Sequence, residues 1–298
     1  MNKKNFLIEL INYMIKKIKY LLQSIIFYLF LFIGRILGLN IGRKLFAFLF
    51  SIIGPHFKSK KIIKENLNIF FNSTSLRDEN TIINDMWKNY GMTFVEYMFL
   101  NFFKKNNSHI NTEGEENLLI KTLNEKPVIF VSGHFANYEL MSMEITKKNI
   151  SLATIYRPLN NIFLNPFMEY LRKKYVCKNQ IKKGIKGVRE VIEYVKKKHS
   201  IALMIDQRVS EGEKLNFFGK PAFTTTLPAQ LSTKYNLDII PVFIKRDEKN
   251  IFKIEFQKRI NPKNFKGKIE LTKELNKVLE KMITRNPNQW IWTHNRWK

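Results

Sequence analysis

The stretch VIFVSGHFANYE, Val128–Glu139, decides how this chain folds and where its chemistry lies. Its apolar first half is typical of a buried strand, and the run breaks at Gly133 just before a histidine. In open α/β sheets the active site lies at the carboxyl ends of the strands. A carboxylate near a histidine can hold the ring in one tautomer and stabilise it once it is protonated. His134 and Glu139 therefore predict an enzyme that removes a proton from a hydroxyl.

The residues between His134 and Glu139 predict a tight strand-to-helix turn. On an ideal helix, side chains five positions apart point in directions that differ by about 140° around the helix axis. The side chains of His134 and Glu139 therefore meet only if His134 lies in the loop. Gly133 suits a sharp exit because glycine tolerates φ > 0, and the Asn137 amide can order the turn or contact a substrate. The alternative is a core histidine beside an unrelated surface glutamate.

Outward from this stretch, short apolar runs alternate with segments of helical periodicity. The strands are predicted at 128–132, 152–156, 201–205, 239–244 and 252–257. The helices are predicted near 77–103, 138–148, 163–175, 187–198, 228–235 and 268–284. This alternation predicts an α/β fold, with a mainly parallel central sheet flanked by helices.

Polar residues follow two further predicted strands at the point where each strand ends. Arg157 comes directly after one strand, and Asp206, Gln207 and Arg208 come after another. Because the carboxyl ends of parallel strands share one edge, we expect these side chains to lie near His134 and to bind substrate. Each of them could instead be a solvated loop residue.

The N-terminal part of the chain predicts attachment to a membrane. Residues 20–34 contain no charge, and a second apolar run covers residues 45–55. The first run is shorter than the roughly 20 residues that cross a bilayer, and it reaches that length at Leu39 if Arg35 snorkels. An interfacial helix and a buried core helix are the alternatives. We expect an anchor at residues 1–55 and one catalytic domain at residues 56–298.

The formal net charge of +26 predicts an anionic partner, although a biased composition rich in lysine explains part of it. A basic nucleic-acid-binding protein is disfavoured, because the sequence has no zinc finger, no RNP motif and no basic region with heptads. The single cysteine, Cys177, excludes an internal disulfide and a cysteine-based metal cluster. The sequence also holds no histidine–cysteine cluster, and we expect no metal and no cofactor.

Motifs along most of the chain resemble the lipid A late acyltransferases of the lauroyl and myristoyl type. They are GHFANYE at 133–139, YRPLNN at 156–161, DQ at 206–207, FFG at 217–219, LPAQL at 227–231, IIPVF at 239–243 and NPNQWIWTHNRWK at 286–298. The histidine–acid motif is shared with glycerolipid acyltransferases, and the tryptophan-rich ending is more specific. The chain departs from the usual pattern at Glu139, Ala136 and Tyr138, where Asp, Gly and Trp are common.

The resemblance implies transfer of a fatty acyl group from acyl carrier protein to a hydroxyl on a 3-hydroxyacyl chain of a lipid A precursor. His134 would be the general base and Glu139 its orienting partner. Arg172, or Arg157, would stabilise charge on the thioester oxygen. The resemblance also implies a glycerolipid-acyltransferase-like sheet, with the catalytic domain on the cytoplasmic side of the bacterial inner membrane.

Three alternatives stay open on the sequence. The same chemistry could act on another glycolipid, a phosphoinositide mannoside, an aminolipid or a lysophospholipid. A nucleic-acid-binding protein is the second alternative, and an inactive homologue that serves as a membrane scaffold is the third. The intact His134 and Glu139 disfavour the scaffold.

Overall fold

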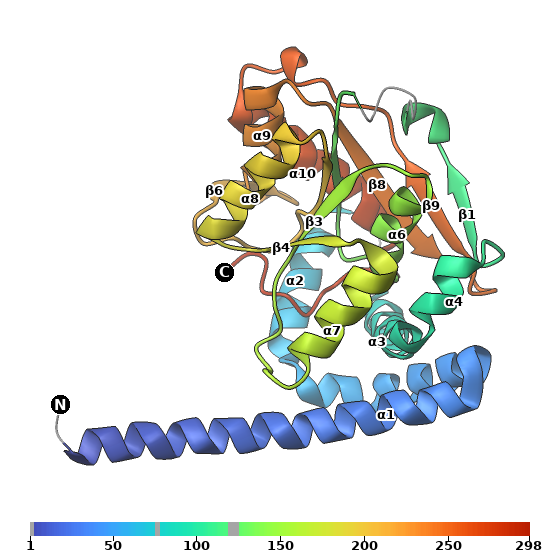
Figure 1. Cartoon of the computed structure of the whole chain (residues 1–298), viewed down its shortest axis with the longest axis vertical. Helices are drawn as coiled ribbons and strands as arrows, with labels where there is room; N and C mark the ends of the chain where they lie inside the picture. The colour runs from blue at the N-terminus through green and yellow to red at the C-terminus, as the bar shows by residue number, and fades with distance from the viewer. Residues whose placement is uncertain (1–2, 75–77, 119–124) are drawn as a thin grey trace.

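The structure, a computed structural model that describes residues 3–74, 78–118 and 125–298, is built around one twisted sheet (Figure 1). Seven strands from these residues form the sheet in the order β1-β9-β8-β2-β5-β3-β4. They are β1 (Ile110–Glu113), β2 (Ile129–Ser132), β3 (Leu152–Tyr156), β4 (Asn179–Lys182), β5 (Ser200–Met204), β8 (Ile239–Arg246) and β9 (Phe252–Phe256). β6 (Glu213–Phe217) and β7 (Lys220–Thr224) form a separate antiparallel hairpin.

The strand that carries the opening motif lies at the centre of this sheet. β2 pairs in parallel with β5 on one side and with β8 on the other, so that Phe130 is level with Ala202 and Ile240. All four residues of β2 are buried, as expected of a strand covered on both faces. Among the strand pairs that the structure describes in this seven-stranded sheet, only β8–β9 is antiparallel. The predicted α/β fold with a mainly parallel sheet is confirmed.

The helices of the described chain include the predicted ones, with shifted ends. They are α1 (Lys3–Phe57), α2 (Lys60–Ser73), α3 (Glu79–Glu96), α4 (Leu100–Lys105), α6 (Glu139–Lys147), α7 (Asn165–Leu171), α8 (Ile185–Lys196), α9 (Leu227–Tyr235) and α10 (Lys268–Arg285). The single helix expected over 77–103 is divided by a 3₁₀ turn, η1 (Tyr97–Phe99), and its predicted start at Arg77 lies outside the described residues. After α7, a π-helical turn, η3 (Arg172–Val176), carries Arg172. Further 3₁₀ turns are η2 (Glu115–Leu118), η4 (Pro262–Asn264) and η5 (Pro287–Gln289).

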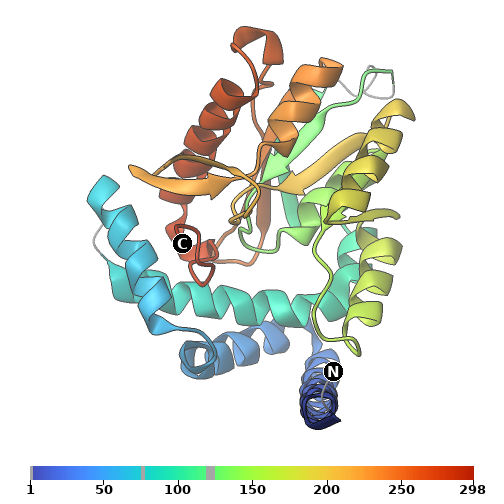
Figure 2. The same cartoon turned by 90° about the vertical axis from the view of Figure 1, so that its left-hand side faces the viewer.

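Helix α1 lies along the outside of the body, next to α3 (Figures 1 and 2). It holds both apolar runs and is interrupted at Gly38, whose φ of 74° is not helical. Residues from Ile8 to His56 make one helix long and apolar enough to cross a membrane by length and composition. Part of this helix packs on the protein, because Phe27 and Phe46 contact Phe94 of α3 with ring centroids 4.8 and 5.4 Å apart. The other face of α1 is exposed and apolar.

Candidate active site

His134 follows β2 and is held by Asp206, which follows the neighbouring strand β5. Its Nδ1 lies 2.7 Å from Asp206 Oδ1, and its backbone N–H donates to Asp206 Oδ2 at 2.7 Å. The Asp206 carboxylate is completely buried. With the proton assigned to Nδ1, the other ring nitrogen, Nε2, keeps a free lone pair. The imidazole is therefore arranged to accept a proton at Nε2.

Trp290 completes the surroundings of the Asp206 carboxylate. Its indole Nε1–H donates to Oδ2 at 2.9 Å, and the tryptophan itself is buried. Burial alone would raise the pKa of Asp206. The charge of His134 and the hydrogen bonds from His134 and Trp290 outweigh burial, so this pKa lies below its ordinary value. Asp206 thus stays ionised beside the histidine, which is a correction to its expected role as a substrate-binding residue.

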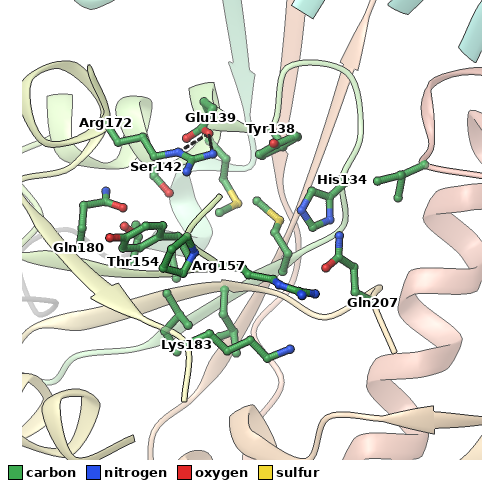
Figure 3. Close-up of a pocket in the computed structure, with 18 of the residues that line it drawn as sticks. His134, Tyr138, Glu139, Ser142, Thr154, Arg157, Arg172, Gln180, Lys183 and Gln207 are labelled. Atoms are coloured by element: carbon green, nitrogen blue, oxygen red, sulfur yellow. Dashed lines mark hydrogen bonds and ion pairs between the residues drawn. The ribbon is translucent and has the colours of Figure 1, made fainter. Parts of the chain in front are cut away.

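Glu139 takes a different partner from the one that the sequence led us to expect. Its Oε1 accepts hydrogen bonds from Arg172 Nε and from Tyr97 Oη, each at 2.7 Å. Because α6 begins at Glu139, this side chain projects from the first helical turn toward η3, while His134 lies in the preceding loop. The expected pairing of Glu139 with His134 is wrong in this structure. Figure 3 shows Glu139 joined to Arg172, with His134 standing apart.

Asn137 is buried and does not face the cavity, which corrects its expected contact with substrate. Its side-chain amide donates to Glu96 Oε2 at 2.9 Å, and none of its surface is exposed. Glu96 in turn pairs with Arg43 Nε at 2.7 Å and with both terminal nitrogens of Arg246. The turn after His134 is therefore fixed to a buried ion-pair cluster, which joins α1, α3 and β8.

The turn itself is tighter than expected, and its unusual backbone lies at a different residue. Gly133 is needed for space, since a Cβ there would lie 2.8 Å from Phe135 and 3.2 Å from Asp206 Oδ2. The positive φ, 45°, belongs to Ala136. Its carbonyl accepts a hydrogen bond from Thr93 Oγ1 at 3.2 Å, and its N–H donates to the Gln289 carbonyl at 3.1 Å. These contacts hold a conformation that a non-glycine residue seldom adopts.

A cavity of about 470 Å³ opens beside His134. It is lined by the predicted site residues His134, Glu139, Arg157, Arg172 and Gln207 (Figure 3). Its apolar wall comes from α6 and β5, and includes Met141, Leu203 and Met204. Arg208 does not line it, since its Nε donates to the Lys298 carbonyl at 2.9 Å. The structure thus brings five of the predicted residues to one cavity, whereas Asp206 and Asn137 lie behind it.

A second histidine, His294, also lines this cavity. Its Nε2 accepts the Arg208 backbone N–H at 2.9 Å, and burial lowers its pKa to about 4. The ring is therefore neutral at physiological pH, and the nitrogen that it presents to Arg208 is engaged. Tyr138 packs edge-on against the His134 ring with centroids 4.6 Å apart and restrains it. Of the two histidines, His134 is the one placed to act as a base.

The sequence analysis missed several residues that build this site. Trp290 was noted only as part of the C-terminal motif at 286–298, and the structure shows it buried against the Asp206 carboxylate. Tyr97 and Glu96 carried no signal, because they belong to a helical segment far from the motif in sequence. Within the described chain, the histidines, cysteine and carboxylates nowhere gather as a group of three that could hold a metal ion.

Comparisons with known proteins give the family of this chain. The family model for bacterial lipid A biosynthesis acyltransferases matches residues 13–298. A lipid A biosynthesis palmitoleoyltransferase from Escherichia coli K12 is 24% identical over 255 residues, which cover 81% of this chain and 79% of that protein. A lipid A biosynthesis acyltransferase from Shigella flexneri gives the same values. The crystal structure of a 1-acyl-sn-glycerophosphate acyltransferase from Thermotoga maritima is similar at 18% identity and a TM-score of 0.42, covering 85% of this chain and all of that one. The chain is an acyltransferase and belongs to the bacterial lipid A biosynthesis acyltransferase family.

Proposed function

We propose that this protein transfers a fatty acyl group from the thioester of acyl carrier protein to the hydroxyl of a 3-hydroxyacyl chain on a lipid A precursor. Membership of the family supports a lipid A-type acceptor. The observation that carries the mechanism is the hydrogen bond between His134 Nδ1 and the buried carboxylate of Asp206, which leaves Nε2 available beside the cavity. An acceptor hydroxyl placed there can lose its proton to Nε2 as it attacks.

His134 alone can act first as the base and then as the acid of this reaction. The hydroxyl oxygen forms a bond to the thioester carbonyl carbon while Nε2 takes the hydroxyl proton. When the carbon–sulfur bond breaks, the imidazolium returns that proton to the leaving thiolate. Asp206 stabilises the imidazolium between these steps, since it is ionised and in direct contact with the ring. General-base assistance of this kind is typically worth about 10²–10⁴-fold in rate.

Negative charge on the thioester oxygen needs donors at the same cavity. Arg172 is the stronger candidate, because it is largely buried and Glu139 and Tyr97 fix its orientation. Burial alone would lower the pKa of Arg172, but the Glu139 charge raises it above the ordinary value, so the side chain stays a cation. Arg157 is exposed at the mouth of the cavity and is better placed to meet a phosphate. In this proposal Gln207 and Arg157 bind substrate, and Glu139 acts through Arg172.

The proposed setting is the cytoplasmic face of the bacterial inner membrane, with α1 as the anchor and residues 56–298 as the catalytic domain. The exposed apolar face of α1 supports attachment to a membrane. The net charge of +26 suits three acidic partners, namely acyl carrier protein, phosphorylated lipid A precursors and anionic lipid.

The test is transfer by the purified protein in detergent. Acyl-loaded carrier protein and a lipid A precursor with a free hydroxyacyl chain are incubated with the protein, and mass spectrometry follows the lipid. We expect a product heavier by one acyl chain with the wild-type protein. With His134→Gln, the rate should fall by at least about 100-fold, because proton removal is lost.

The matched control is His199→Gln, which changes another imidazole, near the start of β5 at the opposite end of the sheet. It should transfer at the wild-type rate. Wild-type activity in a folded His134→Gln protein would contradict the assignment of the base. If the protein acylated a lysophospholipid or another glycolipid but not the lipid A precursor, the proposed acyl-transfer reaction would stand. The proposal that lipid A is the acceptor would be rejected.

A further inference from the structure

The exposed large apolar side chains of the described residues are unevenly distributed along the chain. Most of them belong to α1, from Ile8 to Ile52. The others outside α1 are Phe102 in α4, Tyr170 in α7, Ile185 and Val188 in α8, and Leu159, Ile162 and Phe163 in the loop between β3 and α7. This loop, residues 157–164, follows a strand whose carboxyl end lies at the cavity.

The β3–α7 loop is fixed to α1 by hydrogen bonds between polar groups. Asn161 Nδ2 donates to the Tyr20 carbonyl at 2.9 Å, and Ser24 Oγ donates to Asn161 Oδ1 at 3.0 Å. Tyr28 Oη donates to the Phe163 carbonyl at 2.9 Å. Because the partners on α1 lie in its first apolar run, the loop is held against an uncharged stretch of the helix that is long and apolar enough to cross a membrane. Figure 1 shows the loop at the base of the body, above α1.

The same loop forms the mouth of the cavity. Pro158, Leu159 and Asn160 line it, and so do Arg157 and Lys183, which lie near one another (Figure 3). Burial and the neighbouring Arg157 charge lower the pKa of Lys183, so an anionic group between the two cations would be favoured. An apolar rim bordered by cations matches a bilayer surface, whose acyl chains lie beneath anionic headgroups.

We propose that the β3–α7 loop is a second membrane-inserting element, which seats the mouth of the cavity on the lipid surface so that the acceptor enters from the leaflet. In this arrangement α1 lies along the membrane surface over the residues that pack on the body, with its apolar face in lipid. The inference rests on the proposed membrane association. It adds that Leu159, Ile162 and Phe163 enter the lipid and that the cavity opens there.

The experiment places an environment-sensitive fluorophore on single cysteines of the full-length protein in a Cys177→Ala background. The positions are Ile162→Cys in the loop, Ile36→Cys on the exposed face of α1, and Lys126→Cys just before β2, at the opposite end of the sheet. Vesicles of phosphatidylglycerol and phosphatidylethanolamine, with and without a quencher on the acyl chains, report insertion. We expect a blue shift and quenching at Ile162→Cys and at Ile36→Cys, and no change at Lys126→Cys.

The other outcomes distinguish failure of the loop inference from failure of the proposed membrane association. Insertion at Ile36→Cys, with Ile162→Cys still in water, would overturn the loop inference and leave membrane association standing. No insertion at either position would reject both. A blue shift at Ile162→Cys that appears with acyl carrier protein and not with vesicles would replace the lipid by a protein partner.

An activity measurement completes the test. Ile162 is half exposed and does not line the cavity, so Ile162→Asn should leave transfer to a detergent-dispersed acceptor within about twofold of wild type. Transfer to an acceptor embedded in vesicles should fall by about tenfold. Equal losses in both assays would contradict a membrane role for the loop.

Discussion

At the scale of single residues, the site depends on the hydrogen bonds that the buried Asp206 carboxylate accepts. A buried carboxylate stays charged only when donors replace the water that it has lost. Asp206 has three donors, namely the ring and the backbone N–H of His134 and the indole of Trp290. Each donor also fixes the direction in which the carboxylate faces the ring. Trp290 is therefore a positioning residue for His134.

Trp290→Phe keeps most of the aromatic volume and removes the N–H. We expect the transfer rate to fall by about tenfold, since a hydrogen bond to a charged group contributes roughly 1.5–3 kcal/mol and each 1.4 kcal/mol is a factor of ten. The lost donor should also raise the pKa of Asp206 and move the acidic limb of the pH–rate profile toward higher pH. The measurement is the pH dependence of kcat/KM.

Trp292→Phe is the matched control, because it removes an indole N–H that donates to the Pro287 carbonyl instead. It should lower stability without moving the pH–rate profile. If both variants shift the profile equally, or neither does, the role assigned to Trp290 is contradicted.

The sequence predicted His134 but could not predict its partner. Glu139 is close in sequence, whereas Asp206 is 72 residues further along the chain. The two residues meet because β5 pairs with β2, so that the loops after both strands begin at the same level. The order of strands is set by the packing of the whole sheet, so it cannot be predicted from a local sequence motif. The signals at Asp206 were its position after an apolar strand and its place in the DQ motif at 206–207, and we interpreted it as a substrate contact.

At the scale of helices and strands, one buried ion-pair cluster connects the elements around the catalytic turn. Glu96 of α3 is fully buried between Arg43 of α1 and Arg246 of β8, and it accepts the Asn137 amide. Burial would raise the pKa of Glu96, but the two arginine charges outweigh it and lower this pKa. Removing one member of such a cluster leaves the others buried without a counter-charge.

Glu96→Gln should lower the free energy of unfolding by about 3–5 kcal/mol, because Arg43 and Arg246 would lose their common counter-charge. Glu255→Gln is the control, since its pair with Arg285 is partly exposed and should contribute at most about 1 kcal/mol. Denaturant unfolding in detergent gives both values. A loss below 1 kcal/mol for Glu96→Gln would show that the cluster does not hold α1, α3 and β8 together.

The strands that the sequence analysis missed at the edges of the sheet have weak apolar patterns. β4 reads NQIK and β1 reads INTE, so neither has the apolar run that identified the central strands. In the β6–β7 hairpin, the turn residues Phe218 and Gly219 both have positive φ, 50° and 75°. A two-residue turn of this kind usually has Asn or Asp before the glycine. With a phenylalanine at that position, the sequence gives no indication of a hairpin turn. The central strands were predictable because burial on both faces requires apolar residues.

At the scale of the whole molecule, one buried and one partly buried histidine make stability depend on pH. The pKa of His109 is lowered from 6.5 to about 4 by burial and then by the charges of Lys147 and Arg43. That of His294 is lowered to about 4, also chiefly by burial. Both groups bind a proton more readily in the unfolded chain, so stability falls as the pH drops from about 6.5 to 4. Asp206, whose folded pKa is lowered, contributes stability that is lost only at still lower pH.

His109→Phe should remove much of this pH dependence. Neither ring nitrogen of His109 has a hydrogen-bond partner within the described structure, and the ring packs on Phe103 with centroids 4.7 Å apart. The wild-type protein should lose about 3 kcal/mol at this site between pH 6.5 and pH 4, at 1.36 kcal/mol per pKa unit. Unfolding measured across this range checks it. A variant that retains the full wild-type slope would contradict the assignment to His109.

The most direct test of the central claim is the transfer rate of Asp206→Asn beside that of Glu139→Gln. Asparagine keeps the shape of the side chain and removes the charge that stabilises the imidazolium. We predict that Asp206→Asn loses about 10²–10⁴-fold in rate across the pH range. Glu139→Gln should lose activity by releasing Arg172, and Glu139→Asp, which keeps the charge, should restore part of it. An Asp206→Asn protein that folds and transfers acyl groups within a few-fold of wild type would contradict the proposal that His134 and Asp206 form the catalytic pair.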